Sequence, residues 1–289
     1  MILPDLTFVA TANAVKYTGA KPVLVDSEKT TWNLNPALIE ERITPRTKAI
    51  IAVHLYGHPA KMDEILSISR KHNLFLIEDA CEAHGALFKG KKIGSIGDIG
   101  VFSFYGNKII TTGEGGMIVT NNRKIYDRVK LLRDHAMSRS KKYFHSEVGF
   151  NYRLTNIQAA IGLAQLENIE HIIKRKIEIA HIYNKKLEDL EEIDLPPEEA
   201  WAKNVYWMYS ILVKEQERNR LIKGLSSIGI ETRPFFIPMH RLPPYRTIKR
   251  FPVSDKLSKC GINLPCFVEI TPKQINYICD KVKELLIKK

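Results

Sequence analysis

An acid and a lysine follow two neighbouring strand-like segments of this chain. The apolar run 74–77 ends in a Glu-Asp pair that includes Asp79, and Lys108 follows the run 99–104 in a Gly-rich stretch. A carboxylate at the end of a buried strand is costly unless a cation or hydrogen-bond donors hold its charge. A partly desolvated lysine on a tight turn offers a free amine for Schiff-base chemistry. Either residue alone is more often a solvent-exposed charge, so it is their joint spacing that indicates a site.

The elements that must position these groups are strands of one sheet. Short β-rich runs alternate with helical patterns up to about residue 135, at residues 22–26, 49–53, 74–77, 99–104 and 117–120. Residues 62–72 have helical spacing and join two of these runs as a crossover should. We therefore predict an α/β fold with a largely parallel sheet. Its carboxyl edge, where cofactors bind, is where Asp79, Ser103 and Lys108 are expected to meet.

The second half of the chain has a different pattern. Long helical periodicity begins at residue 157 and runs into a charged stretch near residue 174. A strand-like run at 205–213, a helix at 218–228 and a final amphipathic helix at 273–286 follow. We predict two domains. Residues 1–165 would form a large cofactor-binding domain, and residues 166–289 a connector helix and a small α+β domain.

Composition excludes several classes of protein. Of the 289 residues, 44% are hydrophobic and 26% charged, a balance typical of a folded soluble domain rather than a disordered chain. No apolar run approaches the ~20 residues of a membrane span, and the opening residues carry no secretory signal. We therefore expect a cytoplasmic protein without a membrane partner. Its four irregularly spaced cysteines predict reduced structural thiols.

Several further signals are set aside. The formal net charge of +12 would attract a polyanion, but carboxylates lie between the basic residues, so we predict no nucleic-acid partner. His54 and His58 have metal-like spacing, yet Gly57 and Pro59 would break the helix that must carry them, and no metal is predicted. The Gly-x-x-x-x-Gly-Lys stretch at 85–91 lacks the following Ser or Thr of a phosphate loop.

Several motifs resemble the sugar aminotransferases of the DegT and StrS group. They are residues 7–13, 53–57, EDACEAHGA at 78–86, GDIGVFSFYGNK at 97–108, GEGGM at 113–117 and GFNYRLTNIQAA at 149–160. The resemblance covers nearly the whole chain. It implies the aspartate aminotransferase-like (type I) fold of pyridoxal 5'-phosphate (PLP) enzymes, with a mostly parallel sheet in the large domain and a smaller α+β C-terminal domain.

The resemblance implies a role for individual residues. Lys108 would bind PLP covalently as a Schiff base, and Asp79 would keep the pyridine nitrogen protonated. Phe8 would stack on the ring and Ser103 would bind the phosphate. Asn151 would reach the phosphate in a neighbouring subunit, which implies a homodimer with shared active sites.

One position departs from the family pattern. Glu82 stands where many members carry Gln, at the place that would face the 3-oxygen of the cofactor. A Gln amide always has hydrogens to donate, whereas a Glu carboxyl accepts hydrogen bonds and donates only when it is protonated.

The implied reaction is transamination of a nucleotide-linked keto sugar. The free amine of Lys108 would carry a proton between the amino donor and the cofactor, and then do the reverse on the keto sugar. Relatives that act as sugar dehydratases put His in place of the lysine, so Lys108 favours amino transfer.

Two stretches, 201–209 and 233–245, look most like the perosamine-forming members of the family. Those members aminate carbon four of GDP-4-keto-6-deoxymannose with glutamate as donor. Arg233 could bind a base or a diphosphate, and His240 could contact the sugar or nucleotide. The alternatives stay open, since aromatic runs are more often core and a satisfied structural histidine is at least as common.

Family members normally carry further helices and a Ser-Gly-Thr turn before the segment that matches residues 1–4. We therefore expect the N-terminal part of the large domain to be missing from this sequence. The alternative to an enzyme is a truncated, non-catalytic remnant that binds or regulates a complete homologue.

Overall fold

A six-stranded sheet forms the centre of the computed structural model, which describes residues 1–287. Its strands lie in the order β2 (Val23–Val25), β1 (Ile2–Pro4), β3 (Ala49–Val53), β4 (Phe75–Asp79), β7 (Ile99–Ser103) and β8 (Gly116–Val119). All neighbours pair in parallel except β7 and β8, which are antiparallel. The predicted α/β fold with a largely parallel sheet is confirmed, and β8 is its one antiparallel edge strand.

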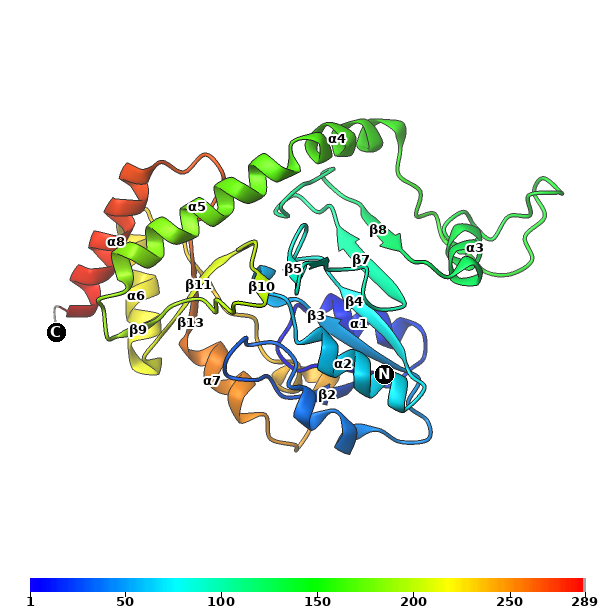
Figure 1. The fold of residues 1–289 in the computed structure, drawn as a ribbon, viewed down its shortest axis with the longest axis horizontal. Helices are drawn as coiled ribbons and strands as arrows, with labels where there is room; N and C mark the ends of the chain where they lie inside the picture. The colour runs from blue at the N-terminus through cyan, green and yellow to red at the C-terminus, as the bar shows by residue number, and fades with distance from the viewer. Residues whose placement is uncertain (288–289) are drawn as a thin grey trace.

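Helices cover the sheet and build a second lobe beside it (Figure 1). Near the sheet lie α1 (Ala10–Tyr17), α2 (Met62–Lys71), α3 (Arg123–Leu132) and α7 (Pro252–Cys260). The second lobe contains α6 (Glu215–Ser227) and α8 (Pro272–Ile287). Between the lobes run α4 (Asn156–Glu167) and the 19-residue α5 (Ile169–Leu187). The sequence predicted a connector helix in this part of the chain, and its role between two domains stays a prediction.

Two smaller sheets and several 3₁₀ turns complete the fold. One sheet joins β10 (Ala202–Lys203), β5 (Leu87–Phe88) and β6 (Lys91–Lys92). The other lies in the second lobe and joins β12 (Arg233–Pro234), β13 (Gly261–Leu264), β11 (Tyr209–Val213) and β9 (Ile193–Asp194). The 3₁₀ turns are η1 (Pro36–Leu38), η2 (Glu40–Arg42), η3 (Leu55–Gly57), η4 (Met239–Arg241) and η5 (Pro243–Tyr245).

The hydrophobic core connects the two halves of the sequence more closely than the predicted boundary after residue 165 suggests. The helix α5 contributes Ile173 to the core cluster that contains Ile50 and Leu76 of the sheet, and Ile179 to the core of the second lobe. The late segment that carries Met239 and Phe251 turns back and packs on Leu3 of β1. The division at residue 165 therefore stays a prediction, because C-terminal segments complete the core of the large domain.

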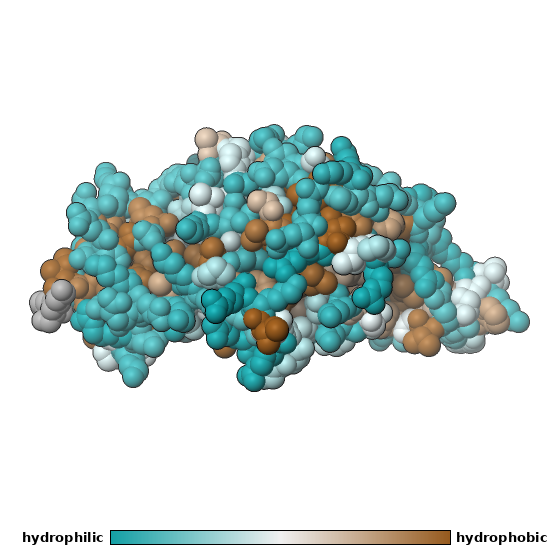
Figure 2. Space-filling view, turned by 90° about the horizontal axis from the view of Figure 1, so that it is seen from below, coloured by the Kyte–Doolittle hydropathy of each residue, from teal (hydrophilic) through white to brown (hydrophobic). Residues whose placement is uncertain are grey.

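Many of the exposed apolar side chains belong to three segments between residues 116 and 167. They lie on the edge strand β8, on α4 and on the segment 143–152, and include Met117, Ile118, Phe144, Val148, Phe150, Tyr152, Ile157, Ile161, Leu163 and Leu166. In contrast, the face seen from below in Figure 2 is mostly hydrophilic, with small scattered apolar patches. Single exposed apolar residues need no explanation, but a contiguous group of them indicates an interaction surface. No helix in the described part of the chain is long and apolar enough to span a bilayer.

Gly57 brings the chain segment at 206–207 close to the end of β3. Its φ is +106°, and a Cβ added there would lie 2.8 Å from the backbone nitrogens of both Tyr206 and Trp207. We expect Gly57→Ala to lower the free energy of unfolding by about 3 kcal/mol, since backbone strain and overpacking add.

The matched control is Gly19→Ala, where φ is +75° but nothing lies within 4 Å. This change should cost only about 1 kcal/mol. Urea unfolding of both variants measures the difference, and equal losses would contradict the close approach at Gly57.

Candidate active site

Asp79 ends β4 at the carboxyl edge of the sheet. The hydroxyl of Thr11, in the first turn of α1, donates a hydrogen bond to its Oδ2 at 2.7 Å. The backbone N–H of Cys81 donates to its Oδ1 at 3.3 Å. Asp79 remains partly exposed. Two donors therefore fix the carboxylate while it keeps access to the crevice, as an acid that pairs with a ligand cation requires.

The preceding residue, Glu78, is the acid that is fully buried. Its carboxylate accepts hydrogen bonds from the backbone N–H groups of Gly94, Ile96 and Gly97, and it lies 3.3 Å from His54 Nε2. Although burial opposes ionisation, these partners hold the pKa of Glu78 below its usual value. The sequence did not show which of the two acids, Glu78 or Asp79, needs a partner for its charge. Glu78 has its partners within the protein, so it needs no ligand.

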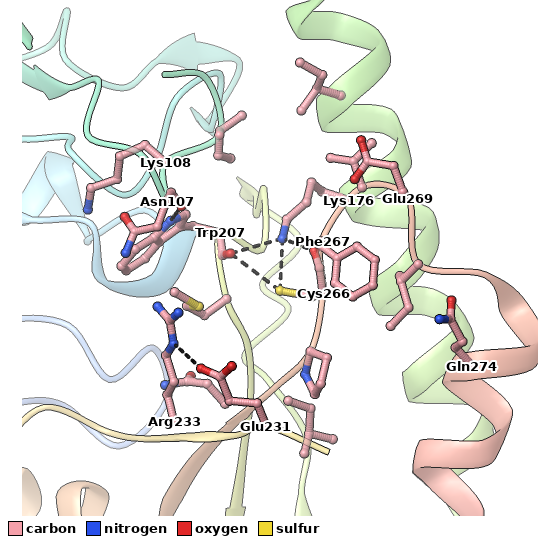
Figure 3. Close-up of a pocket in the computed structure, with 18 of the residues that line it drawn as sticks. Asn107, Lys108, Lys176, Trp207, Glu231, Arg233, Cys266, Phe267, Glu269 and Gln274 are labelled. Carbon is pink, nitrogen blue, oxygen red and sulfur yellow. Dashed lines mark hydrogen bonds and ion pairs between the residues drawn. The ribbon is translucent and has the colours of Figure 1, made fainter. Parts of the chain in front are cut away.

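Lys108 lies in the turn that follows β7. Its ammonium is 3.9 Å from the centroid of the Trp207 ring, and the Trp207 Nε1–H donates to the carbonyl of Asn107 at 2.7 Å. A cation over an indole face gains electrostatic attraction. Trp207, which is almost 100 residues away in sequence, therefore holds the turn and the amine together (Figure 3).

The charge of Lys108 affects the pKa values of two buried side chains, Glu82 and His84. Burial raises the pKa of Glu82 from 4.5 to about 7, while the charge of Lys108 opposes this rise and that of Asp79 adds to it. Burial, together with the charge of Lys108, lowers the pKa of His84 from 6.5 to about 4. Glu82 Oε2 accepts the backbone N–H of Tyr56 at 2.8 Å. Asp79, Glu82, His84 and Lys108 therefore belong to one electrostatic neighbourhood.

The other predicted residues, Phe8, Ser103 and Asn151, lie in different surroundings. The ring of Phe8 is 53% exposed and lies 5.7 Å from the ring of Phe236. Ser103 ends β7, and its hydroxyl accepts the N–H of Tyr105 at 3.3 Å. Asn151 lies on the exposed segment beyond α3, where its backbone bridges to Asp134. No hydrogen bond of the Asn151 side chain is found among the described residues, so the role of Asn151 in a neighbouring subunit stays a prediction.

A cavity of about 1080 Å³ opens beside Lys108 (Figure 3). Lys108, Trp207 and Arg233 line it, and so does the buried Lys176. The Lys176 ammonium donates to the carbonyls of Trp207 at 3.1 Å and Cys266 at 2.5 Å. The cavity is large enough for a small-molecule ligand. Its three cationic side chains outnumber the two carboxylates of its lining, Glu231 and Glu269, and this balance favours an anionic ligand.

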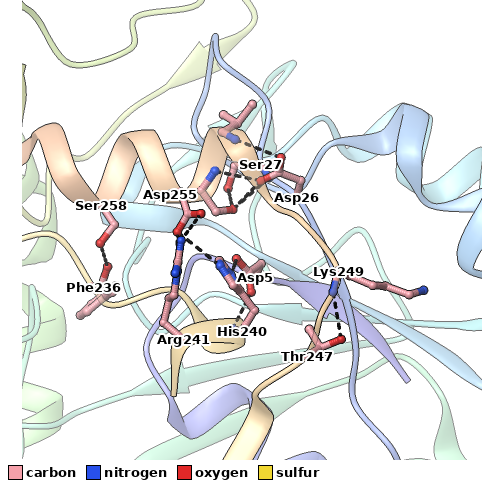
Figure 4. Close-up of polar contacts among 12 residues, drawn as sticks. Asp5, Asp26, Ser27, Phe236, His240, Arg241, Thr247, Lys249, Asp255 and Ser258 are labelled. Atoms are coloured by element: carbon pink, nitrogen blue, oxygen red, sulfur yellow. Dashed lines mark hydrogen bonds and ion pairs between the residues drawn. The ribbon is translucent and has the colours of Figure 1, made fainter. Parts of the chain in front are cut away.

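Arg233 and His240, the predicted substrate contacts, lie in different environments. Arg233 is exposed at the cavity and pairs with Glu231 at 3.7 Å. His240 is only 6% exposed, and both of its ring nitrogens face carboxylates (Figure 4). Arg233 is thus available to a ligand, whereas the nitrogens of His240 are already engaged by the protein.

The arrangement fits PLP. An amine suited to bind its aldehyde, a carboxylate for its ring nitrogen and an exposed aromatic face all come from elements at the carboxyl edge of one sheet. Both nitrogens of His84 are buried without a hydrogen-bond partner among the described residues, although its ring packs 5.3 Å from that of Phe102. Such unpaired buried polar atoms need an explanation, and a bound ligand is one.

Sequence reasoning did not single out Thr11, His84 or Trp207 as members of the site. Thr11 and His84 lie inside motifs that indicated the family, but nothing local reveals which atoms they approach. Trp207 could be assigned to the core or to a ligand site, and the structure makes it both buried and adjacent to Lys108.

Comparisons with known proteins agree with this geometry. A model of the DegT/DnrJ/EryC1/StrS aminotransferase family matches residues 1–283. The chain is 46% identical to a GDP-perosamine synthase of Escherichia coli O157:H7, over 98% of this chain and 78% of the relative. It is 38% identical to the putative pyridoxal phosphate-dependent aminotransferase EpsN of Bacillus subtilis strain 168, over 90% of this chain and 71% of the relative.

A solved structure is also closely similar. The chain superposes with a TM-score of 0.93 on S. venezuelae DesV in complex with a ketimine intermediate. The two sequences are 33% identical, and the match covers 98% of this chain and 77% of DesV.

The pKa of Glu82 predicts a pH dependence of stability. Because its pKa is about 7 in the folded protein and 4.5 without burial, the folded state binds more protons between these values. Stability should therefore fall as pH rises from about 4.5 to about 7, by up to about 3 kcal/mol relative to Glu82→Gln. Denaturant unfolding from pH 4 to pH 8 measures this difference.

Glu64→Gln, at an exposed position of α2, is the control and should follow the wild-type curve. Parallel curves for wild type and Glu82→Gln would show that the Glu82 carboxyl does not titrate in this window.

Proposed function

The chain belongs to the DegT/DnrJ/EryC1/StrS aminotransferase family, and on that premise we propose that it transfers an amino group from glutamate to carbon four of GDP-4-keto-6-deoxymannose. It is a PLP-dependent sugar aminotransferase. The observation that carries the choice of substrate is the 46% identity to a GDP-perosamine synthase. The product would be GDP-perosamine, a precursor for surface polysaccharide.

Each of the proposed PLP-binding residues supplies a matching group. Asp79 would hold the proton on the ring nitrogen, Phe8 would cover one face of the ring, and Ser103 would bind the phosphate. Glu82 would face the 3-oxygen. When bound, PLP supplies an electron sink that stabilises negative charge on the carbon that loses its proton.

Asp79 is oriented for this contact. Thr11 and the Cys81 N–H each donate to one of its two oxygens, which holds the side chain without closing off the crevice. A carboxylate oriented in this way would accept a hydrogen bond from the ring nitrogen.

Lys108 would move the proton. As a free amine, its Nζ takes a proton from the carbon that carries the donor nitrogen, and its ammonium form returns a proton on the other side of the reaction. The Trp207 ring, 3.9 Å away, stabilises the ammonium without a carboxylate partner that would trap the proton. With the keto sugar, the Nζ of Lys108 would carry out the same proton transfer in the opposite direction.

The cavity beside Lys108 would receive the sugar nucleotide. Arg233 lies at the cavity and would bind the diphosphate or base. Its ion pair with Glu231 is long, at 3.7 Å, so the guanidinium can exchange this partner for a phosphate.

The alternative of a non-catalytic remnant is not favoured. The family and relative matches extend over nearly the whole chain, and the groups that the chemistry needs are present and supported by other residues.

We also propose that two copies of the chain form a homodimer with shared active sites. The exposed apolar group on β8, α4 and the segment 143–152 is the surface that a second copy would cover. The rings of Phe150 and Tyr152 stack 5.1 Å apart on this surface, beside Asn151. In the dimer, Asn151 would reach the phosphate in the partner's site.

The cytoplasm is the proposed location. Each of the four cysteines is a free thiol, which suits a reducing compartment.

Lys108 should be essential for cofactor attachment and turnover. Holoenzyme is expected to show a visible absorbance band from covalently bound PLP and to convert GDP-4-keto-6-deoxymannose with glutamate to a 4-amino sugar. Lys108→Ala should lose the band and about a thousandfold in turnover, because both the attachment point and the proton carrier are removed.

Absorbance spectra and mass spectrometry of the product are the measurements, and the exposed Lys92→Ala is the control. An unchanged band in Lys108→Ala would refute the assignment. A faster reaction with a TDP-linked than with a GDP-linked keto sugar would refute the substrate.

The proposed dimer predicts a charge-sensitive interface. Ile157 of α4 is 76% exposed, and Ile157→Asp should shift the protein from dimer toward monomer in sedimentation velocity, since it places a charge in an apolar contact. Ile248→Asp, at a fully exposed isoleucine elsewhere, should leave the dimer intact. Wild-type protein that sediments as a monomer would contradict the proposal.

A further inference from the structure

The ring of His240 is held between two carboxylates from distant parts of the chain. Its Nδ1 lies 2.7 Å from Asp5 Oδ2, and its Nε2 lies 3.3 Å from Asp255 Oδ1 (Figure 4). The ring also stacks on Phe251 at a centroid distance of 4.8 Å. Arg241 fixes Asp255 with two hydrogen bonds of 2.9 and 2.7 Å. The orientation of the imidazole is therefore determined on both sides.

Asp5 is the inner of the two carboxylates and is completely buried. It follows β1, and its side chain accepts the backbone N–H of His240 at 2.9 Å in addition to the ring contact. Its own carbonyl accepts the N–H of Met239 at 2.7 Å. A buried carboxylate needs such donors, so the position of the chain at Asp5 depends on the turn η4 that carries His240.

The residues after Asp5 form one side of the proposed cofactor site. Phe8 follows three residues later, and Thr11, which donates to Asp79, follows in α1. A shift at Asp5 would therefore move both the aromatic face and the donor that orients the carboxylate for the ring nitrogen.

The segment 233–240, which ends at His240, also contacts the proposed cofactor site through Phe236. The ring of Phe236 packs 5.7 Å from that of Phe8, and the Phe236 N–H donates to the hydroxyl of Tyr56 at 3.1 Å. Arg233, at the start of this segment, lines the cavity. The segment 233–240 thus runs from the cavity to the end of β1.

We propose that His240 is a positioning residue: through Asp5 it fixes the connection between β1 and α1, and with it Phe8 and Thr11, and it does not contact substrate. This proposal rests on the proposed PLP site. It replaces the substrate contact considered for His240 in the sequence, because neither ring nitrogen is free to meet a ligand.

Substitution of His240 by Asn or by Gln distinguishes the roles of its two ring nitrogens. His240→Asn places an N–H near the position of Nδ1 and can keep the bond to Asp5. His240→Gln reaches farther, toward Asp255, and loses the bond to Asp5. A matched control is His72→Asn, since His72 Nε2 lies 2.7 Å from Glu40 in a surface pair far from the site.

The experiment measures the dissociation constant of PLP by equilibrium dialysis of holoenzyme, and the KM of the keto sugar. His240→Gln should weaken PLP binding about tenfold, the effect of one lost buried hydrogen bond. His240→Asn and His72→Asn should stay within about twofold of wild type, and the KM of the sugar should change little in any of them.

Two outcomes would overturn the proposal. A rise in the KM of the sugar in both His240 variants, with unchanged PLP affinity, would make His240 a substrate contact. An equal loss of PLP affinity in the Asn and Gln variants would assign the effect to packing on Phe251 rather than to the bond with Asp5.

A further variant covers the case in which His240→Gln does not fold, as judged by circular dichroism. Asp5→Asn keeps the size of the side chain but weakens the charge-assisted bond, and it should weaken PLP binding about threefold; unchanged affinity would overturn the proposal. PLP affinity is measured without sugar, so a failure of the proposed substrate leaves this test intact.

Discussion

The proposed active site depends on an amine and a carboxylate that the protein holds by separate contacts at the carboxyl edge of one sheet. Asp79 is held by Thr11 and a backbone N–H, and Lys108 lies over the ring of Trp207. Each charge thus has its own support from the protein. An ion pair between the two would satisfy both, but it would leave neither available to a cofactor.

The supports come from segments that are far apart in the chain. Trp207 reaches Lys108 because Gly57 lets residues 206–207 approach the end of β3. Thr11 reaches Asp79 from α1, and α1 is tied through Asp5 to His240. The C-terminal third of the sequence therefore shapes both sides of a site whose reactive residues lie in the first half.

Burial has opposite consequences for neighbouring acids. Glu78 is surrounded by N–H donors and stays ionised, whereas Glu82 has one backbone donor and a raised pKa. The same low dielectric strengthens a well-paired charge and penalises a poorly paired one. Glu82 is thus the acid whose protonation state can change near neutral pH, at the position that faces the cofactor in the proposed site.

The sequence by itself determined the α/β class with a largely parallel sheet and the place of most main strands along the chain, because apolar periodicity is a local property. It could not decide which of Glu78 and Asp79 is buried, since consecutive strand residues point to opposite faces and only packing selects the face. Nor could it pair His240 with Asp5, which is 235 positions away, or Trp207 with Lys108, which is about 100 positions away. Such distant residues come into contact only when the chain has folded.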